Sequence, residues 1–121
     1  MKRVDLGFTE LEIYDDFAVG RTRTGVDIDL EKHEQVMDVL RREIPGRFGI
    51  IVDEVNSYSV RFEVLRAMRK DPRIACAAAV VYRFATIKAM AVAAMVAGTP
   101  SKTFSTLDEA KDWVRDQLSR G

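Results

Sequence analysis

The chain has 121 residues, the size of one domain, and a domain of this length buries enough apolar surface to fold without disulfides. Its 19 basic and 19 acidic residues cancel, and neither sign forms a long block, which argues against a nucleic-acid partner. We therefore expect a single domain over residues 1–121 that does not bind nucleic acid.

The first residues carry no export signal, because the charged start Met1-Lys2-Arg3 is not followed by an apolar segment. Residues 74–98 are apolar enough to suggest a membrane span. However, Arg83 and Lys88 stand in the middle of this stretch, and a charge at that depth costs at least about 2.5 kcal/mol. A buried strand followed by a buried helix explains the same residues, so we expect a cytoplasmic protein without a membrane span.

Extended segments open the chain. Residues 6–14 alternate imperfectly between apolar and polar, Asp15-Asp16 favours a turn, and residues 17–21 resume the extended pattern. This order predicts an antiparallel hairpin. Asp27 or Asp29 can then cap a helix, because a short carboxylate accepts hydrogen bonds from free backbone N–H groups.

The helix predicted over residues 30–44 has one apolar stripe, whose members recur at three- and four-residue steps: Leu30, His33, Met37, Leu40 and Ile44. Pro45-Gly46 ends it. The only histidine, His33, lies on or beside the stripe, and a lone histidine is poor evidence for a metal ligand. We interpret it as a residue at the edge of the core and expect no metal site.

The stretch from Phe48 to Ser59 is the most informative in the chain. An apolar run short enough for a buried strand ends in Asp53-Glu54 and continues into Asn56-Ser57-Tyr58-Ser59, after which the pattern becomes helical as far as Asp71-Pro72. The carboxyl end of a strand and the free N–H groups of the next helix converge at such a place, which is where open α/β sheets hold their sites. We therefore expect the functional site here.

A second apolar run, residues 74–82, lacks alternation and predicts a central strand that is covered on both faces. It contains Cys76, which we interpret as a buried, inert thiol. Thr86 as a cap and Gly98 as a terminator predict a further, broadly buried helix over residues 87–97.

The tail contains a short strand over residues 102–104 and then a helix. Thr106 and Glu109 have the spacing of a capping box at the start of that helix. Its predicted inner face is formed by Leu107, Ala110, Trp113, Val114 and Leu118.

The predicted order of elements is β-β-α-β-α-β-α-β-α. Strands that are separated by helices are normally parallel, whereas the first hairpin adds an antiparallel partner. We therefore predict an α/β domain with a mixed sheet, in which an antiparallel N-terminal hairpin joins parallel strands, and with about four helices.

Three segments resemble the SpoIIAA-like family, which belongs to the broader group of STAS and SEC14-like domains. They are the strand ending in Val52-Asp53 with Asn56-Ser57-Tyr58-Ser59 behind it, the Ala/Val-rich strand at 74–82, and the tail over residues 103–114. The resemblance spans roughly residues 6–118 and implies a small mixed α/β domain. Better-known relatives regulate sigma factors and are switched by phosphorylation of a serine at the start of the helix after the third strand.

Ser57 and Ser59 occupy the region that corresponds to the switch in those relatives. The relatives carry Asp-Ser-Ser or Asp-Ser-Thr followed by glycine, whereas here Glu54-Val55-Asn56 separates Asp53 from Ser57 and no glycine follows. Three roles are open for the two serines: capping of the next helix, contact with a ligand, or phosphorylation, in which the phosphate would gain from the helix dipole.

We favour a non-enzymatic STAS-like regulatory or protein-interaction module, whose contact surface is the loop from Asn56 to Ser59 and the basic face of the following helix. The alternative is a carrier of a small apolar molecule or lipid, with a pocket in the Ala- and Met-rich wall of residues 74–98. For that pocket Tyr58, Tyr82 and Arg83 supply the polar groups.

An enzyme is the least favoured class, and we expect no cofactor. Asp53 and Glu54 are adjacent in a strand, so they point to opposite faces and do not form a general acid/base pair. Tyr58 and Arg61, one helical turn apart, could hold an anion. No catalytic residue is assigned, and the binding or phosphorylation candidates are Asn56, Ser57, Tyr58, Ser59, Arg61, Tyr82 and Arg83. A homodimer through the hairpin edge or the last helix is left open.

Overall fold

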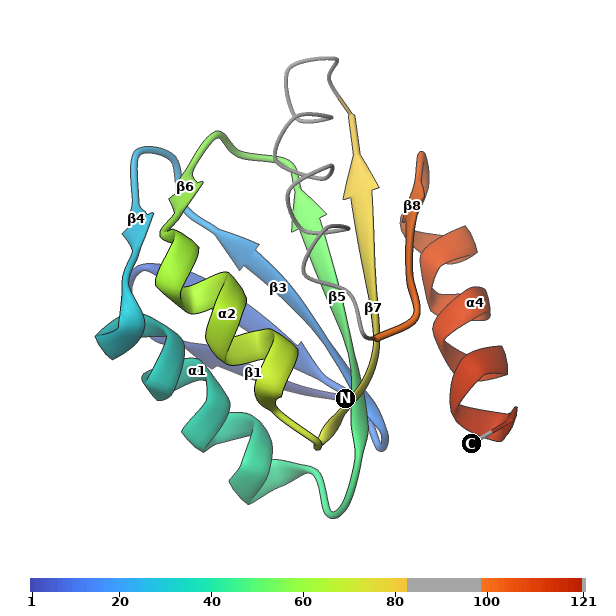
Figure 1. Cartoon of the computed structure of the whole chain (residues 1–121). Helices are drawn as coiled ribbons and strands as arrows, with labels where there is room; N and C mark the ends of the chain where they lie inside the picture. The colour runs from blue at the N-terminus through green and yellow to red at the C-terminus, as the bar shows by residue number, and fades with distance from the viewer. Residues whose placement is uncertain (83–98, 121) are drawn as a thin grey trace.

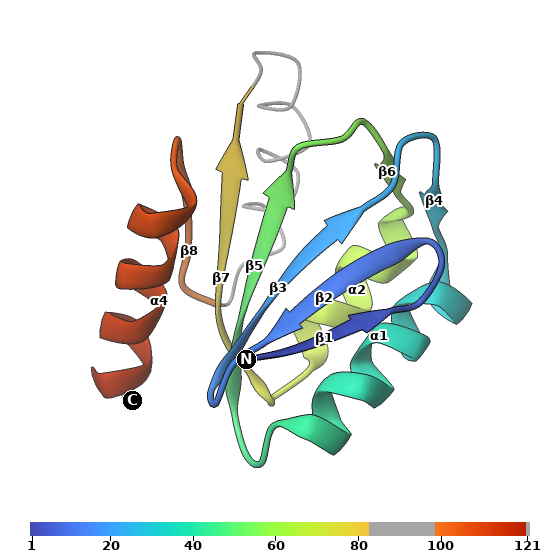
Figure 2. The same cartoon turned by 180° about the vertical axis from the view of Figure 1, so that it is seen from behind.

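The computed structural model describes residues 1–82 and 99–120, which form one mixed α/β domain. The main sheet is six-stranded with strand order β1-β2-β3-β5-β7-β8, and it is twisted, as Figures 1 and 2 show. Neighbouring strands are antiparallel from β1 to β3 and parallel from β3 to β8. The strands are β1 Lys2–Asp5, β2 Thr9–Ile13, β3 Phe17–Thr22, β5 Phe48–Glu54, β7 Ile74–Val81 and β8 Ser101–Phe104. The predicted mixed sheet is confirmed.

Three helices are described, and they lie on both faces of the sheet. Helices α1 (Leu30–Glu43) and α2 (Phe62–Lys70) lie side by side on one face, as Figures 1 and 2 show, and α4 (Leu107–Arg120) packs on β5, β7 and β8 on the other. The fourth predicted helix, residues 87–97 with Thr86 as its cap, falls outside the described residues.

Alternation along the strands creates one core on each face. Beneath α1, the buried strand residues include Leu11, Ile13, Ala18 and Phe48, and the predicted helical stripe supplies His33, Met37, Leu40 and Ile44; Leu30 is exposed. Beneath α4 the core consists of Phe17, Val19, Ile51, Cys76, Ala78, Val80, Ala110 and Val114. The free thiol of Cys76 is buried as predicted, and burial raises its pKa to about 11.

Gly49 allows α4 to approach the sheet closely. A Cβ atom on this residue would lie 2.5 Å from Cγ1 of Val114 and 3.1 Å from Sγ of Cys76. Only glycine therefore fits beneath the middle of α4.

The amino-terminal part has one strand more than the predicted hairpin. Its turn at Asp15-Asp16 is present, but residues 6–8 are not part of the strand, and Gly7 takes a positive φ of 90° in a second turn. Strand β1 precedes that turn and pairs with β2, so that Lys2 lies opposite Ile13. The sequence analysis missed β1 because three of its four residues are charged, as is common at an exposed sheet edge.

A second, two-stranded sheet connects the starts of α1 and α2. Strand β4 (Asp27–Ile28) pairs in parallel with β6 (Ser59–Val60), and this small sheet was not predicted. Of the two proposed caps for α1, Asp29 caps the helix: its Oδ1 accepts a 2.9 Å hydrogen bond from N of Lys32. Asp27 instead lies in β4.

The other predicted helix boundaries are present. Helix α2 ends at Lys70, immediately before Asp71-Pro72. Thr106 caps α4, because its Oγ1 accepts a hydrogen bond from N of Glu109 and donates one of 2.8 Å to Oε1 of that residue. Within the described part of the chain, no helix has the length and apolar character needed to cross a membrane.

Candidate functional site

The carboxyl ends of β3, β5 and β7 meet at one edge of the sheet, because these three strands are parallel. Val52 is paired with Gly20 on one side and with Ala79 on the other. The next residue along β3, Arg21, and the next along β5, Asp53, therefore lie beside one another at the edge where the sequence analysis expects the site.

Arg21 joins two carboxylates on the face of the sheet that carries α4. Its Nε donates a 2.7 Å hydrogen bond to Oδ2 of Asp53, and its Nη1 donates one of 2.7 Å to Oε2 of Glu12 on β2. Burial acts against the charged guanidinium, but the two carboxylates outweigh it, so the pKa of Arg21 is raised. Asp53 is therefore held in an ion pair.

Asp53 is the most buried carboxylate of this edge, with a side chain only 5% exposed. Its second oxygen, Oδ1, is buried and has no hydrogen-bond partner among the described residues. Tyr82, which follows β7, is 51% exposed. Burial of its hydroxyl raises the pKa of Tyr82, and the nearby Asp53 carboxylate raises it further.

Glu54 points to the opposite face of the sheet, as predicted from strand alternation. Its Oε1 accepts a 3.0 Å hydrogen bond from Oη of Tyr58. Burial raises the pKa of Glu54, and burial together with the Glu54 carboxylate strongly raises the pKa of Tyr58. Asp53 and Glu54 thus form two separate polar contacts and not one acid/base pair.

The loop after β5 is attached to the segment between β3 and α1 by hydrogen bonds along its length. Nδ2 of Asn56 donates to O of Thr22 at 3.1 Å, N of Gly25 donates to O of Ser57 at 2.9 Å, and N of Ser59 donates to O of Val26 at 3.0 Å. The loop backbone therefore has a defined conformation, although Ser57 itself is exposed.

Ser59 and Arg61 converge on one carboxylate of β4. Oγ of Ser59 donates to Oδ1 of Asp27 at 3.0 Å, and Nε of Arg61 donates to Oδ2 of Asp27 at 2.8 Å. The hydrogen bonds from Arg61 and Ser59 lower the pKa of Asp27, and the bond to Asp27 raises the pKa of Arg61.

Two expectations for this loop are wrong for the same reason. Helix α2 begins at Phe62 with Arg61 at its N-cap position and no side-chain cap, so neither Ser57 nor Ser59 caps it. Tyr58 and Arg61 are not one helical turn apart and bind different acids, Glu54 and Asp27. Pairing of β6 with β4 keeps this segment extended, and a non-local pairing of two residues leaves no pattern in the local sequence.

The site also contains two residues that the sequence analysis did not single out. Val55 is 48% exposed and follows Glu54, the last residue of β5, whose partner Val81 immediately precedes Tyr82. Arg21 is the other omission. Its signal was a lone arginine at the end of an extended segment, which is too common to identify an ion pair.

The predicted site residues are thus divided among three places. Asn56, Ser57 and Tyr58 lie in the loop, Ser59 and Arg61 lie at β6, and Tyr82 lies at the end of β7. Arg83 falls outside the described residues, as does most of the wall over residues 74–98 that the carrier hypothesis requires. In the described part of that wall, Cys76, Ala78 and Val80 pack in the core beneath α4.

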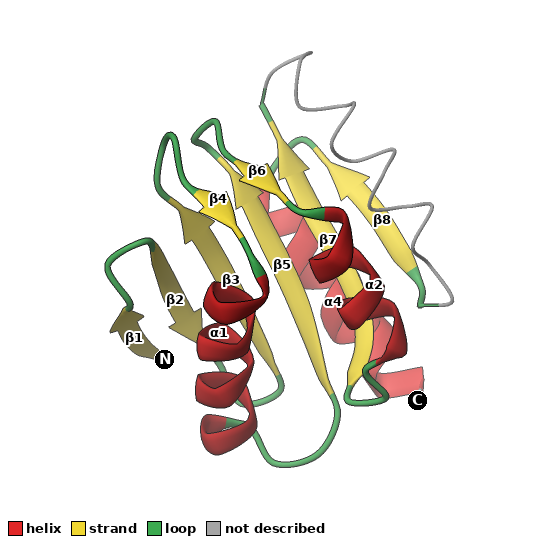
Figure 3. Ribbon diagram, turned by 60° about the vertical axis from the view of Figure 1, so that its left-hand side comes forward, coloured by secondary structure: helices red, strands yellow, loops and turns green. Residues whose placement is uncertain are grey.

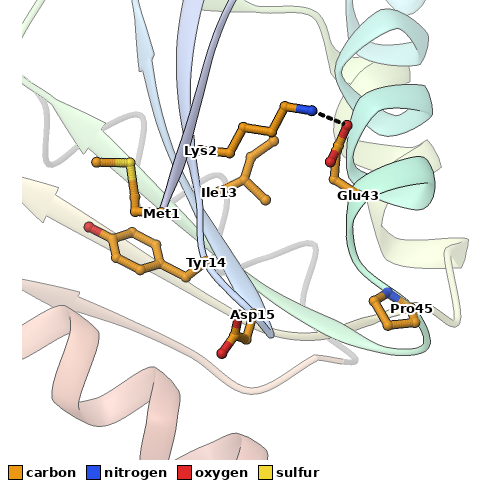
Figure 4. A pocket seen from close by; sticks show the side chains of 7 residues that line it. All are labelled: Met1, Lys2, Ile13, Tyr14, Asp15, Glu43 and Pro45. Atoms are coloured by element: carbon orange, nitrogen blue, oxygen red, sulfur yellow. Dashed lines mark hydrogen bonds and ion pairs between the residues drawn. The ribbon is translucent and has the colours of Figure 1, made fainter.

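A pocket of about 470 Å³ lies at the other end of the sheet (Figure 4). It is lined by Met1, Lys2, Ile13, Tyr14, Asp15, Glu43 and Pro45, and the Lys2–Glu43 ion pair of 2.8 Å crosses one side of it. None of the predicted site residues lines it. In the described ranges, no group of three or more His, Cys, Asp or Glu side chains is placed to hold a metal ion.

Comparison with known proteins supports the fold. No protein-family model and no curated protein matches the chain. A crystal structure of an uncharacterized protein of the DUF3478 family from Shewanella loihica PV-4, described as having a SpoIIAA-like fold, superimposes with a TM-score of 0.62 and 14% identity. The match covers 88% of this chain and 91% of that chain. The chain therefore has a SpoIIAA-like fold, as the resemblance implied.

Proposed function

We propose that this chain, which has a SpoIIAA-like fold, is a non-enzymatic regulatory or protein-interaction module. Its contact surface is the exposed part of the loop from Val55 to Ser59 together with Tyr82. We refer to these residues below as the loop surface.

The acids at this edge support binding in preference to catalysis. A general acid or base must lie within hydrogen-bond reach of the substrate proton that it transfers. Asp53 is held by Arg21 at 2.7 Å, Glu54 accepts from Tyr58 at 3.0 Å, and Asp27 accepts from both Ser59 and Arg61. Each carboxylate thus serves to fix part of the scaffold.

One observation carries the proposal: the loop backbone is fixed while its outer side chains face solvent. Thr22, Gly25 and Val26 hold the loop through hydrogen bonds, so little conformational entropy is lost when a partner binds. Val55 and Tyr82 are 48% and 51% exposed, and tyrosine side chains such as that of Tyr82 are common anchors of protein interfaces.

The hydroxyl groups of the loop provide a means of regulation. Oγ of Ser59 is engaged by Asp27, whereas Ser57 is exposed and its side chain makes no hydrogen bond among the described residues. A phosphate on Ser57 would add negative charge in the middle of the loop surface and alter partner binding. We therefore propose Ser57 as the phosphorylation site of the loop.

Site-specific photo-crosslinking tests the proposed function. A photoreactive amino acid replaces Ser57 in one variant and Asp108 in a control; Asp108 is exposed in the first turn of α4, on the opposite face of the sheet from α2 (Figure 1). We expect a specific protein to crosslink at residue 57 and not at residue 108 in cells that express the chain. The captured protein is then purified, and calorimetry measures its affinity for the wild type and for the Val55→Asp and Tyr82→Ala variants.

We expect both substitutions to weaken binding about tenfold or more, since anchor residues of an interface contribute more than about 1.4 kcal/mol each. Equal crosslinking at both positions, or unchanged affinity in both variants, would contradict the proposal. Turnover of a substrate by the purified chain alone would contradict its non-enzymatic character.

A further inference from the structure

We propose that a second copy of this chain docks on the outer faces of α1 and α2, with the two copies related by a two-fold axis that runs between these helices and parallel to them. This dimer surface is separate from the loop surface, so the inference goes beyond the proposed function. It also differs from the hairpin edge and the last helix, which the sequence analysis considered.

Pairing of β4 with β6 places the first residues of α1 and α2 at the same position along the helix axes, and we call two such residues level with each other. Ile28 of β4 is paired with Val60 of β6, and each helix begins two residues further on, α1 at Leu30 and α2 at Phe62. Figure 3 shows the two helices side by side and running in the same direction on this face of the sheet. A residue of α1 is therefore level with the residue 32 positions later in α2.

Each helix exposes a stripe of residues at four-residue steps, and residues four apart lie on one side of a helix. The α1 stripe consists of Leu30, Glu34 and Asp38, and the α2 stripe consists of Phe62, Arg66 and Lys70; all six residues are exposed. Large apolar groups begin both stripes, with Leu30 41% and Phe62 62% exposed.

The two stripes are complementary at every level. Leu30 is level with Phe62, Glu34 with Arg66, and Asp38 with Lys70. Rotation about an axis parallel to the helices preserves the level, so it brings each α1 residue opposite its α2 counterpart in the other copy. A two-fold interface repeats every contact, and the dimer therefore contains two Leu–Phe contacts and four acid–base pairs.

The charges of the α2 stripe have no acidic partner within the described part of the chain. Arg66, Arg69 and Lys70 form no ion pair there, and the guanidinium of Arg66 lies 4.9 Å from the centroid of the Phe62 ring. On α1, Glu34 and Asp38 each form an ion pair of 3.5 Å with Arg41 and with no other residue of the described chain. The two stripes therefore differ in charge although the 19 basic and 19 acidic residues of the whole chain balance.

Charge exchange tests this geometry directly. The α1 variant carries Glu34→Lys and Asp38→Lys, which makes both of its stripes positive. The α2 variant carries Arg66→Glu and Lys70→Glu, which makes both of its stripes negative. Each variant repels itself, but an equimolar mixture restores attraction at all four acid–base positions of a mixed dimer.

Sedimentation velocity on the full chain, from micromolar to near-millimolar concentration, gives the readout. We expect the wild type to reach twice the 13.7 kDa chain mass and each variant alone to dissociate about tenfold or more readily. The mixture should recover the dimer. A control with Asp108→Lys and Asp112→Lys on α4 makes the same change in net charge as the α1 variant and should leave the dimer intact.

Circular dichroism verifies that each variant is folded, and recovery of the dimer on mixing is a second check. If an exchanged variant melts early, the neutral pair Glu34→Gln and Arg66→Gln replaces it, and each should weaken the dimer. A wild type that is monomeric throughout, variants that dimerise like the wild type, or a mixture that stays monomeric would each overturn the proposal.

Discussion

Oδ2 of Asp53 accepts a 2.7 Å hydrogen bond from Nε of Arg21 across the parallel strands β3 and β5. The pair lies at the carboxyl ends of these strands, on the face of the sheet that α4 covers. Nη1 of the same guanidinium donates a hydrogen bond to Glu12. The Asp53 side chain is only 5% exposed, so Arg21 rather than water supplies most of the compensation for its charge.

Replacing Arg21 with Met should destabilise the domain by about 2 kcal/mol or more, because it leaves a buried carboxylate without its counter-charge. Urea unfolding followed by circular dichroism measures the change. Arg23→Met is the matched control: it removes the exposed Arg23–Asp5 pair of 2.9 Å and should change stability little. Adding Asp53→Asn to Arg21→Met should recover part of the loss. Equal changes in the free energy of unfolding for Arg21→Met and Arg23→Met would contradict the prediction that the buried pair stabilises the domain more than the exposed pair.

The sequence predicted those parts of the fold that follow from local patterns. Periodic apolar residues located α1 and α4, an uninterrupted apolar run located β7, and Thr106 with Glu109 located the start of α4. Each of these signals lies within one segment of the chain. The SpoIIAA-like fold followed from their order and from the resemblance.

The remaining features depend on contacts between distant segments. Strand β6 exists because Ser59 and Val60 pair with Asp27 and Ile28, and this pairing shifts the start of α2 past the predicted position. The Arg21–Asp53 pair likewise requires the register of β3 against β5. The sequence therefore predicted that Asp53 and Glu54 end a strand and that a polar loop follows, but it did not reveal which side chains contact one another there.

Gly49→Ala should destabilise the domain by about 1 to 3 kcal/mol, because the new Cβ would lie 2.5 Å from Cγ1 of Val114 and force α4 away from the sheet. Gly20→Ala is the matched control in the neighbouring strand, where an added Cβ meets Cδ2 of Leu11 at 3.6 Å, an ordinary contact. Thermal unfolding compares the two variants. Combining Gly49→Ala with Val114→Ala should be less destabilising than the sum of the two changes. A Gly49→Ala variant as stable as Gly20→Ala would contradict the close approach.

His33 should make the domain less stable as the pH falls below neutral. Burial lowers the pKa of His33 in the folded state, so the unfolded chain binds a proton at a pH where the folded chain does not. The contribution of the neutral imidazole is present above about pH 6.5, the pKa in the unfolded chain, and is lost as the pH falls toward the folded pKa. Urea unfolding between pH 5 and 8 should give a smaller pH dependence for His33→Gln than for the wild type. Identical slopes would contradict the prediction.

Tyr58→Phe should raise the pKa of Glu54 further. The Tyr58 hydroxyl donates a 3.0 Å hydrogen bond to Oε1 of Glu54 and stabilises the ionised carboxylate, against the burial that raises its pKa. Carbon-13 NMR of the glutamate side-chain carboxyl groups follows this titration residue by residue. Glu43, whose pKa is lowered by its hydrogen bond from Lys2, serves as an internal reference and should keep its titration. An unchanged Glu54 titration would mean that the hydrogen bond does not form in solution.

A serine kinase that acts on this loop should modify Ser57 in preference to Ser59. Oγ of Ser59 is engaged by Asp27, and a phosphate there would face that carboxylate at close range, whereas Ser57 is exposed and its backbone carbonyl accepts from Gly25. Phosphopeptide mass spectrometry of the wild type and of the Ser57→Ala and Ser59→Ala variants measures the modification at each position. Ser57→Ala should remove most of the incorporated phosphate, and Ser59→Ala should leave it in place. Asp27→Asn removes the charge that opposes phosphate at Ser59, and it should increase modification of Ser59 alone. Preferential modification of Ser59 in the wild type would contradict the prediction, since it requires the Ser59–Asp27 hydrogen bond to be broken before the kinase can act.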